Sequence, residues 1–355
     1  MRKVILLLTI VLLGAILRLF QLGKVPISLE WDEVALGYDA YSILKTGKDQ
    51  FGQFFPINFR SLDDYKPPLY VYSAVPAVAL FGLTDFATRL PAAVFGIIAV
   101  ALTYFLCLEL FGGKKEKYLI AFLSSLFLAV SPWHLQFSRA AFETNVSVTV
   151  TLVAILSFLK GVNQKKNKLF LISALFFGIA LFSYHSTRVV TPILLISLFI
   201  LLRKSLPTKK IVFSFLTIYA VFVFFFIPIA TSPDAQIRFL VTNDLKFSEY
   251  QEESAKTILA ESKESDDAEF VSKIFHNRRL AIYNYENAKR ILQNYLKHFS
   301  PKFLFVEGDA PLHHAPGFGN MYFFELPFIL LGGSYYLFRL RRRENLILPL
   351  WLLIA

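Results

Sequence analysis

Long apolar runs alternate with short polar segments along most of the chain. The runs cover residues 4–22, 90–111, 118–136, 144–162, 168–184, 189–202, 211–230, 321–338 and 345–355. Most of them approach the length of about 20 apolar residues that an α-helix needs to cross the hydrocarbon core of a bilayer. The pattern predicts an all-α integral membrane protein with about nine spanning helices, supplemented by juxtamembrane helices on the outer face.

A further apolar run at residues 68–83, "PLYVYSAVPAVALFGL", decides the topology. It is short, and Pro67, Pro68 and Pro76 interrupt it. If it does not cross and "MRK" is inside, the basic connections 112–117, 163–168, 203–210 and 339–345 all lie in the cytoplasm, as the positive-inside rule requires. If it does cross, all of them lie outside. We therefore expect an interfacial or re-entrant helix on the outer face.

This topology assigns individual positions to the two sides of the membrane. We expect Asp64, Glu143 and His313 outside, and Lys115 and Arg342 inside. The chain 1–355 then forms one transmembrane domain with a first outer loop at 24–89 and a large outer loop at 231–320, within which residues 278–299 are patterned as a surface helix. The last apolar run ends with the chain, and we expect the native protein to continue beyond Ala355.

The N-terminus "MRKVILLLTIVLLGAILRLFQLG" begins like a signal peptide. Its apolar stretch is longer than a typical signal core, and no small-residue cleavage site follows it. We interpret it as a retained first helix, in which Arg18 extends its side chain to the outer interface.

Composition agrees with a membrane protein, because 55% of the residues are hydrophobic, 38 are Phe and the mean hydropathy is +0.52. The net charge of +11 does not indicate nucleic acid, since the basic residues gather between apolar runs and no nucleic-acid motif accompanies them. The single cysteine, Cys107, excludes an intrachain disulfide and a Cys-rich metal site.

Polar residues from several separated segments share the predicted outer face. Ionisable groups beside apolar helices are costly to desolvate, so such a set indicates a functional cavity. Its members are Asp32, Glu33, Asp39, Asp63, Asp64, Lys66, Arg89, Arg139, Glu143, His185, Arg188, His313 and His314.

Several motifs resemble the membrane glycosyltransferases of the GT-C fold. They are "WDE" after the first helix, "YKPPLY" about thirty residues later, "ATRLPAAVFG", "SPWHLQFSRAAFE" and "HHAPGFGNMYFFELPFILLGG". The most similar branch depends on dolichyl or undecaprenyl phosphate and includes protein O-mannosyltransferases and lipid A aminoarabinose transferases (glycosyltransferase family 39). The resemblance covers most of the chain and is strongest over residues 28–145.

The resemblance implies a function and roles for particular residues. It implies inverting transfer of a hexosyl or pentosyl group from a polyprenyl-phosphate carrier to a protein, glycolipid or polysaccharide at the outer face of the plasma membrane. It places the catalytic base at Asp32, a phosphate-binding lysine at Lys66 and a second catalytic acid at Glu143. A base removes the proton of the acceptor hydroxyl, and cations stabilise the departing phosphate. The remaining substrate-binding candidates are Glu33, Arg89, Arg139, His185, Arg188 and His313.

The roles of three of these residues have alternatives. Asp32 could cap the helix that starts near "EVALGYDAY", and a nearby Lys66 would stabilise its carboxylate. Lys66 could instead pair with Asp63 or Asp64. Glu33 lies about 100° around that helix from Asp32, so a structural role is also open to it.

The other candidates have alternatives too. Arg139 and Glu143 are four positions apart, so on one helix they could form a simple ion pair. Arg89 could be an interfacial anchor, and His185 could be structural, whereas Arg188 suits a phosphate.

The sequence does not require a metal, although a divalent ion is compatible with it. The aminoarabinose branch has a carboxylate before its "KPPL" lysine, where this chain has Tyr65. His313 and His314 are adjacent and point opposite ways in extended chain, so at most one binds a given metal.

Another class of function also fits a polytopic protein. A lipid or glycolipid transporter or flippase would be expected to carry charges near the membrane midplane and broken spanning helices. This chain instead gathers its charges at the predicted outer ends.

Overall fold

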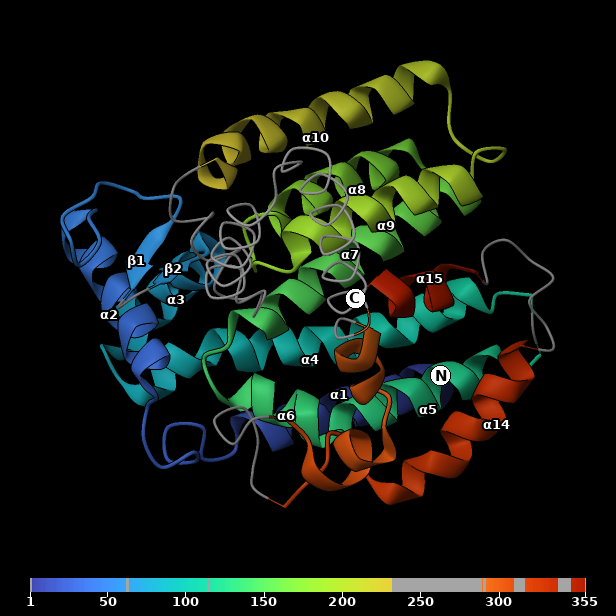
Figure 1. The fold of residues 1–355 in the computed structure, drawn as a ribbon, viewed down its shortest axis with the longest axis horizontal. Coiled ribbons are helices and arrows are strands. Elements are labelled where there is room, and N and C mark those ends of the chain that lie inside the picture. Colours follow the sequence, from blue (N-terminus) through green and yellow to red (C-terminus); the bar gives the residue numbers. More distant parts are fainter. Residues whose placement is uncertain are drawn as a thin grey trace, which may run out of the picture.

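The computed structural model describes residues 2–61, 64–113, 115–231, 289, 292–309, 317–337 and 346–354. His313, His314 and Arg342 lie outside the described residues, as does most of the predicted outer loop 231–320. The described part is mainly a bundle of helices that run side by side (Figure 1).

Every predicted apolar run contains a helix. The helices are α1 (Arg2–Leu19), α4 (Asp85–Leu110), α5 (Lys117–Val130), α6 (Pro132–Arg139), α7 (Glu143–Asn163), α8 (Asn167–Ala180), α9 (Thr187–Leu201), α10 (Lys209–Ala230), α14 (Leu326–Leu337) and α15 (Ile347–Ile354). Among the described residues, three helices (α4, α7 and α10) are long and apolar enough to cross a membrane, or four if α5 and α6, bent by 55°, form one span. The predicted number of nine spans is therefore not confirmed.

The two ends of the helix bundle carry different segments of the chain. In Figure 1 the N-terminus and the connections around residues 112–117, 163–168 and 203–210 lie at the right of the bundle. The elements α2 (Trp31–Thr46), β1 (Phe59–Ser61), β2 (Asp64–Lys66) and α3 (Pro68–Phe81) lie at the left (Figure 1). The described basic connections thus share one end, and the opening polar stretch occupies the other.

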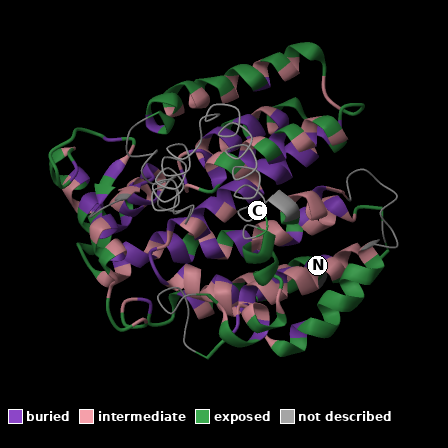
Figure 2. Ribbon diagram, viewed as in Figure 1, coloured by how far each residue is buried: buried purple, intermediate pink, exposed green. Residues whose placement is uncertain are grey.

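The centre of the bundle is formed by α4 and α7, of which α7 is largely buried (Figure 2). The apolar window of α7 is 78% buried, whereas that of α10 is 6% buried. In the described part of the chain α10 packs mainly against α8. The contrast indicates that α7 is a core helix and that α10 lies at the periphery.

The predicted outer loop folds into two helices and a hairpin. The strands β1 and β2 pair antiparallel, with Phe59 opposite Lys66, so the all-α prediction is wrong at this point. The helix α3 is 14 residues long and packs against α2, α4 and α7, in keeping with a run that is too short to cross.

The sequence "KPP" explains how the hairpin passes into α3. A residue before proline is restricted to extended backbone, which applies to both Lys66 and Pro67. Pro67 is extended, with φ −60° and ψ 146°, and Pro68 takes the first helical position, where its missing N–H costs nothing. Lys66 is thereby fixed at the junction of strand and helix.

The prediction that Arg18 extends to the interface is wrong. Its side chain is fully buried and donates hydrogen bonds to the carbonyl oxygens of Leu128 (3.2 Å) and Ala129 (3.0 Å), which end α5. It also contacts Ser138 Oγ (3.2 Å) and His134 Nδ1 (2.6 Å) on α6. The last carbonyl oxygens of a helix lack intrahelical hydrogen-bond partners. Arg18 donates hydrogen bonds to those of α5, at its bend with α6.

The late part of the chain is described in pieces. Residues 292–297 are helical within the predicted surface helix, and they precede a π-helix, η1 (Phe303–Glu307). A 3₁₀ turn, η2 (Phe323–Glu325), leads into α14. The carbonyl oxygen of Asn320 accepts a hydrogen bond from the backbone N–H of Trp133, so this segment docks on the start of α6.

Candidate active site

The site is centred on an ion pair between Asp32 and Lys66. Asp32 lies in the first turn of α2, and Glu30 occupies the N-cap position, so Asp32 does not cap this helix. Lys66 Nζ lies 2.8 Å from Asp32 Oδ2, and 35% of the Asp32 side chain is exposed. The pair joins two segments 34 residues apart and leaves the carboxylate open to a ligand.

A second carboxylate, Glu143, is the first residue of α7 and is buried. Lys66, Asp32 and Arg188 are close enough to interact with its charge. No described residue hydrogen bonds to its Oε1. A buried oxygen without a partner is costly, so Glu143 is suited to binding a group from outside the protein.

His185 links the hairpin to the start of α9. Its Nε2 lies 2.9 Å from the carbonyl oxygen of Tyr65, and its Nδ1 lies 2.9 Å from Arg188 Nη1. Burial lowers the pKa of His185 to about 4, and the charge of Arg188 acts in the same direction. His185 is therefore neutral at physiological pH; Arg188 donates to Nδ1, so the ring proton lies on Nε2 and is donated to Tyr65.

The Arg188 side chain is fixed by hydrogen bonds, but one of its nitrogen atoms has no partner among the described residues. Its Nε donates to the carbonyl oxygen of Leu181 at 3.4 Å, and its guanidinium lies 5.3 Å from the centre of the Phe226 ring on α10. Its Nη2 is buried without a hydrogen-bond partner among the described residues. Since Arg188 lies in the first turn of α9, its charge adds to the positive end of the helix dipole, which favours an anion.

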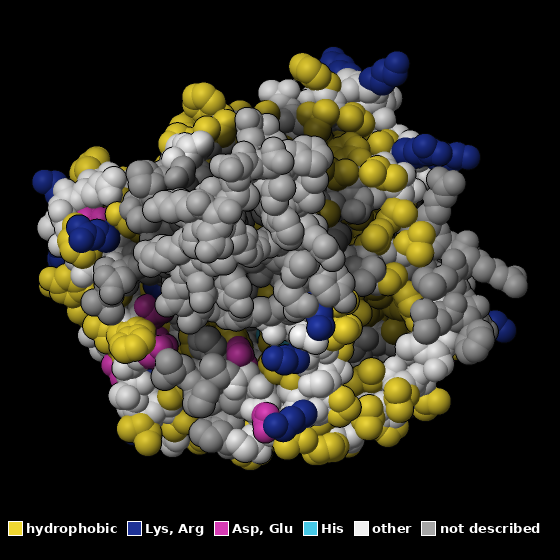
Figure 3. All heavy atoms as spheres, viewed as in Figure 1, with side chains coloured by type: hydrophobic (Ala, Val, Ile, Leu, Met, Phe, Trp, Pro, Cys, Tyr) yellow, Lys and Arg dark blue, Asp and Glu magenta, His cyan; other side chains and the backbone are white. Residues whose placement is uncertain are grey.

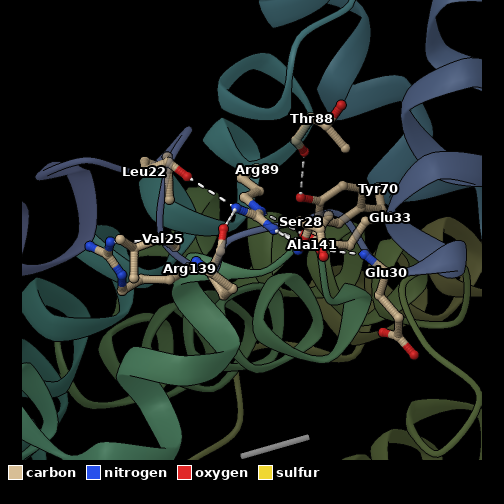
Figure 4. Close-up of polar contacts among 11 residues, drawn as sticks. Leu22, Val25, Ser28, Glu30, Glu33, Tyr70, Thr88, Arg89, Arg139 and Ala141 are labelled. Atoms are coloured by element: carbon tan, nitrogen blue, oxygen red, sulfur yellow. Dashed lines mark hydrogen bonds and ion pairs between the residues drawn. The ribbon is translucent and has the colours of Figure 1, made fainter. Parts of the chain in front are cut away.

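Glu33 and Arg89 form a separate buried network (Figure 4). The Arg89 side chain is fully buried and contacts both carboxylate oxygens of Glu33, with Nε 2.9 Å from Oε1 and Nη2 3.0 Å from Oε2. Glu33 also accepts from the backbone N–H groups of Glu30 (3.0 Å) and Ala141 (2.8 Å). These bonds tie α2, α4 and the connection between α6 and α7 together.

The remaining donors of Arg89 hold the chain between α1 and α2. Nη1 donates to the carbonyl oxygens of Leu22 (3.3 Å) and Pro26 (2.8 Å), and Nη2 donates to that of Ser28 (2.7 Å) (Figure 4). A fully buried arginine is not an interfacial anchor, so that alternative is wrong. Glu33 and Arg89 are placed to position Asp32 through the backbone of α2, and a direct contact with substrate stays a prediction.

Arg139 ends α6 and does not share a helix with Glu143, which begins α7. Its guanidinium donates to the carbonyl oxygens of Leu17 (2.7 Å) and Phe20 (2.9 Å) at the end of α1. It also donates to Val25 O at 3.0 Å. Arg139 therefore provides hydrogen-bond donors for the carbonyl oxygens at the end of the first helix. The alternative of an ion pair between Arg139 and Glu143 on one helix has no geometric basis.

Two residues near the site were missed from the sequence. Tyr184 lies in the turn between α8 and α9, and the charges that act on it include those of Glu143 and Asp309. Adjacency to His185 is a signal that could have identified Tyr184. No sequence pattern marks Asp309, which lies far along the chain in a segment without a motif.

The described residues give no support for a metal site. No group of three or more His, Cys, Asp or Glu among them is arranged to hold a metal ion. His313, the histidine predicted to contact substrate, lies outside the described residues.

The described site can act on a substrate that combines an anion with a hydroxyl group. Three helices, α2, α7 and α9, begin here, and each carries a charged site residue in its first turn. Lys66 and Arg188 provide positive charge, whereas Asp32 and Glu143 can accept protons or hydrogen bonds. This combination fits phosphate as a leaving group and a carboxylate as a base.

Comparisons with known proteins find one matching family model. Residues 65–230, which include Lys66, Glu143 and Arg188, match the family model of dolichyl-phosphate-mannose-protein mannosyltransferases. No curated protein matches the chain.

A solved structure, the first of the two below, shares the fold. The oligosaccharyltransferase of Archaeoglobus fulgidus in complex with Zn and sulfate matches with a TM-score of 0.56 at 16% identity, over 98% of this chain and 45% of that one. ArnT from Cupriavidus metallidurans bound to undecaprenyl phosphate matches with a TM-score of 0.49 at 16% identity, over 66% of this chain and 43% of that one. The chain thus spans less than half the length of these proteins. The expected resemblance to GT-C membrane glycosyltransferases is confirmed by the family match and the fold.

Proposed function

We propose that this chain, which has the family match and the fold of the GT-C membrane glycosyltransferases, moves a sugar from a polyprenyl-phosphate carrier to an acceptor hydroxyl. The observation that carries the proposal is the Asp32–Lys66 pair at 2.8 Å, with Glu143 and Arg188 beside it. Transferase activity on a lipid carrier explains why acids and cations from four separate segments meet at one place.

The proposed reaction is a single displacement. The acceptor oxygen attacks the anomeric carbon, the bond from that carbon to the phosphate oxygen breaks, and its electron pair leaves with the polyprenyl phosphate. Asp32 takes the proton of the acceptor hydroxyl. Lys66 and Arg188 stabilise the charge that grows on the leaving phosphate, an effect that can be worth several kcal/mol in a site that excludes water. Attack from the opposite side inverts the anomeric configuration.

The proposed setting is the outer face of the plasma membrane. The described basic connections lie at the end of the bundle opposite to the site, as expected if the site is extracytoplasmic. The lipid of the donor would remain in the bilayer while its sugar reaches Asp32. The acceptor would be a protein, glycolipid or polysaccharide of the cell envelope, and the sugar a hexose or pentose.

The test is transfer by the purified full-length protein from defined polyprenyl-phosphate sugars. Asp32→Asn should preserve folding and donor binding but lower the transfer rate by about 10²–10⁴-fold, the usual effect of removing a general base. Lys66→Ala should weaken donor binding and lower turnover. Glu116→Gln, at the opposite end of the bundle, is the control and should leave transfer unchanged.

The outcomes separate the competing assignments. Near-normal transfer by Asp32→Asn, together with loss of transfer in Glu143→Gln, would reassign the base to Glu143. If the wild type translocates a labelled polyprenyl-phosphate sugar across vesicles but transfers no sugar, the protein is a transporter or flippase and the enzyme proposal is wrong.

A further inference from the structure

The guanidinium of Arg188 is bonded differently from those of Arg18 and Arg89. In Arg18 and Arg89, Nε, Nη1 and Nη2 all make hydrogen bonds within the described chain. In Arg188, Nε donates to the carbonyl oxygen of Leu181 at 3.4 Å and Nη1 to Nδ1 of His185 at 2.9 Å, whereas Nη2 is buried and has no partner among the described residues. A buried donor without an acceptor is costly, so Nη2 is available to an acceptor that the described protein does not supply.

The guanidinium of Arg188 also lies over an aromatic ring. Its central carbon is 5.3 Å from the centre of the Phe226 ring, which belongs to α10. The electrons of an aromatic ring attract a cation within about 6 Å of its centre. A guanidinium is planar, so two hydrogen bonds at its edge and a ring beside it leave it little freedom to turn. Phe226 therefore helps to fix the direction in which Nη2 points.

The packing of α10 on α8 determines where Phe226 lies. In Figure 1, α10 runs along the upper edge of the bundle, next to α8. Gly178 on α8 permits a close approach, because a side-chain carbon at that position would overlap the Phe222 ring. Just beyond α8, the ring of Phe182 meets that of Phe222 at 6.4 Å and that of Phe226 at 6.2 Å. The Phe226 ring is thus packed against Phe182 as well as Arg188.

Arg188 is tied to the segment that carries the other cation of the site. Nε2 of His185 lies 2.9 Å from the carbonyl oxygen of Tyr65, which precedes Lys66 in the chain. The other ring nitrogen of His185 lies 2.9 Å from Arg188 Nη1. A phosphate can contact Lys66 and Arg188 together only when the guanidinium has one orientation. Affinity is higher when that orientation exists before binding, because no flexible side chain has to be ordered.

We propose that Phe226 is a positioning residue for the donor phosphate, and that its ring holds Arg188 with Nη2 directed at this group. The inference rests on the proposed function and adds a residue of α10 to it. Residues 220–230 carry no ionisable group, so the contribution of this helix is the aromatic ring. Phe226 acts through Arg188 and does not contact the phosphate. Another aromatic residue should replace it, whereas an aliphatic residue should not.

The test measures the affinity of the purified full-length protein for polyprenyl phosphate without a sugar, and for the polyprenol of the same length, which lacks the phosphate. Phe226→Leu should weaken binding of polyprenyl phosphate by about 2- to 10-fold, as expected when one long side chain must be ordered on binding. Binding of the polyprenol should be unchanged. Phe226→Tyr should bind both ligands like the wild type. The matched control is Phe225→Leu, at the neighbouring position, which is 56% exposed, and it should also bind like the wild type.

A double-mutant cycle tests whether Phe226 acts through Arg188. Arg188→Ala should weaken binding of polyprenyl phosphate, and adding Phe226→Leu should cause no further loss, since residues that act as a unit are not additive. The inference is wrong if Phe226→Leu binds polyprenyl phosphate like the wild type, or if Phe226→Tyr binds it as weakly as Phe226→Leu. An equal loss of polyprenol binding would place Phe226 against the lipid chain and also overturn the inference, as would a loss that persists in Arg188→Ala.

Failure of the proposed function gives a different result. If the wild type binds polyprenyl phosphate but transfers no sugar, the proposed function is wrong, and the affinities of the variants still decide the role of Phe226. If the wild type transfers sugar and Phe226→Leu equals it in affinity and in kcat/KM, only the inference about Phe226 is wrong. A wild type that binds no polyprenyl phosphate overturns both.

Discussion

Two buried cations on the same side of the molecule have different uses. Lys66 pairs with a carboxylate that is 35% exposed, whereas the guanidinium of Arg89 gives its hydrogen bonds to Glu33 and to three backbone carbonyls. The geometry of the donors explains the difference, because a guanidinium can bind several fixed acceptors at once and an ammonium is a compact charge. Arg89 is therefore suited to holding the backbone, and Lys66 to meeting a ligand.

We predict that Arg89→Lys destabilises the protein strongly, although it preserves the charge. A lysine cannot contact both oxygens of Glu33 and the carbonyls of Leu22, Pro26 and Ser28 together, so buried acceptors lose their partners. Breaking a buried pair costs about 3–5 kcal/mol. Thermal unfolding in detergent should show a clear fall in Tm.

Lys66→Ala provides the contrast for Arg89→Lys. It should lower transfer far more than it lowers Tm. A variant Arg89→Lys with the Tm of the wild type and reduced donor binding would instead indicate that Arg89 contacts the substrate.

For individual residues, the sequence identified which side chains belong to the site better than it identified their roles. The acidic stretch after the first helix and the lysine of "KPPL" led to Asp32 and Lys66, which the structure joins. The turn of about 100° per residue in a helix also separated Glu33 from Asp32, and the structural role it left open to Glu33 agrees with the contact of Glu33 with Arg89. The sequence misassigned Arg18, whose partners on α5 and α6 lie more than 100 residues away in the chain.

At the scale of elements, the apolar runs predicted the helices well because most continuous apolar stretches form one helix. The hairpin β1–β2 was not predicted, since strands of three residues give no periodic signal. The bend between α5 and α6 was not predicted either. Residues 118–136 form one apolar run, but the helix stops before Pro132, which begins α6.

The loop after α2 depends on a buried carboxylate. Asp39 is buried and accepts hydrogen bonds from the backbone N–H (3.0 Å) and side-chain amide (3.3 Å) of Gln50. Burial raises its pKa from 3.8 to about 6, and the charge of Asp49 adds to the effect. The folded state therefore binds a proton more tightly than the unfolded chain does.

We predict that this loop stabilises the protein most at low pH. The contribution from Asp39 is fully present below pH about 4 and is lost as the pH rises through about 6. The free energy of unfolding should fall across this window by at most about 1.4 kcal/mol per pH unit from this group. Unfolding of the wild type and of Asp39→Asn, measured at several pH values, tests this. The variant should lack this part of the slope, and an identical slope in both proteins would exclude Asp39 as its source.

At the scale of the whole molecule, opposite ends of the bundle carry different chemistry. The basic connections gather at the right in Figure 1, and the Asp32–Lys66 site lies with α2 and β2 at the left. Figure 3 shows apolar side chains over α10 at the top and α14 at the lower right. Charge segregation between the ends, with apolar sides, is the distribution expected of a protein that lies across a membrane.

The gathering of the described basic connections at one end (Figure 1) could be predicted from the sequence, because it depends on where charges occur along the chain, which requires no knowledge of packing. The number of helices that cross the membrane could not be predicted from the sequence. Among the described residues α8 has 14 residues and α9 has 15, so their length alone does not show that they span.

We predict from this arrangement that the two ends of the bundle face opposite sides of the membrane. In a Cys107→Ala background, single cysteines at Gln53 and Ser186 mark the site end, and cysteines at Lys115 and Lys165 mark the basic end. All these positions are exposed, so labelling depends on the side of the membrane and not on burial. An impermeant thiol reagent applied to intact cells should label the first two, and all four should react after permeabilisation. Labelling of Lys115→Cys in intact cells without labelling of Gln53→Cys would invert the topology, and the residues of α3 would then have to cross.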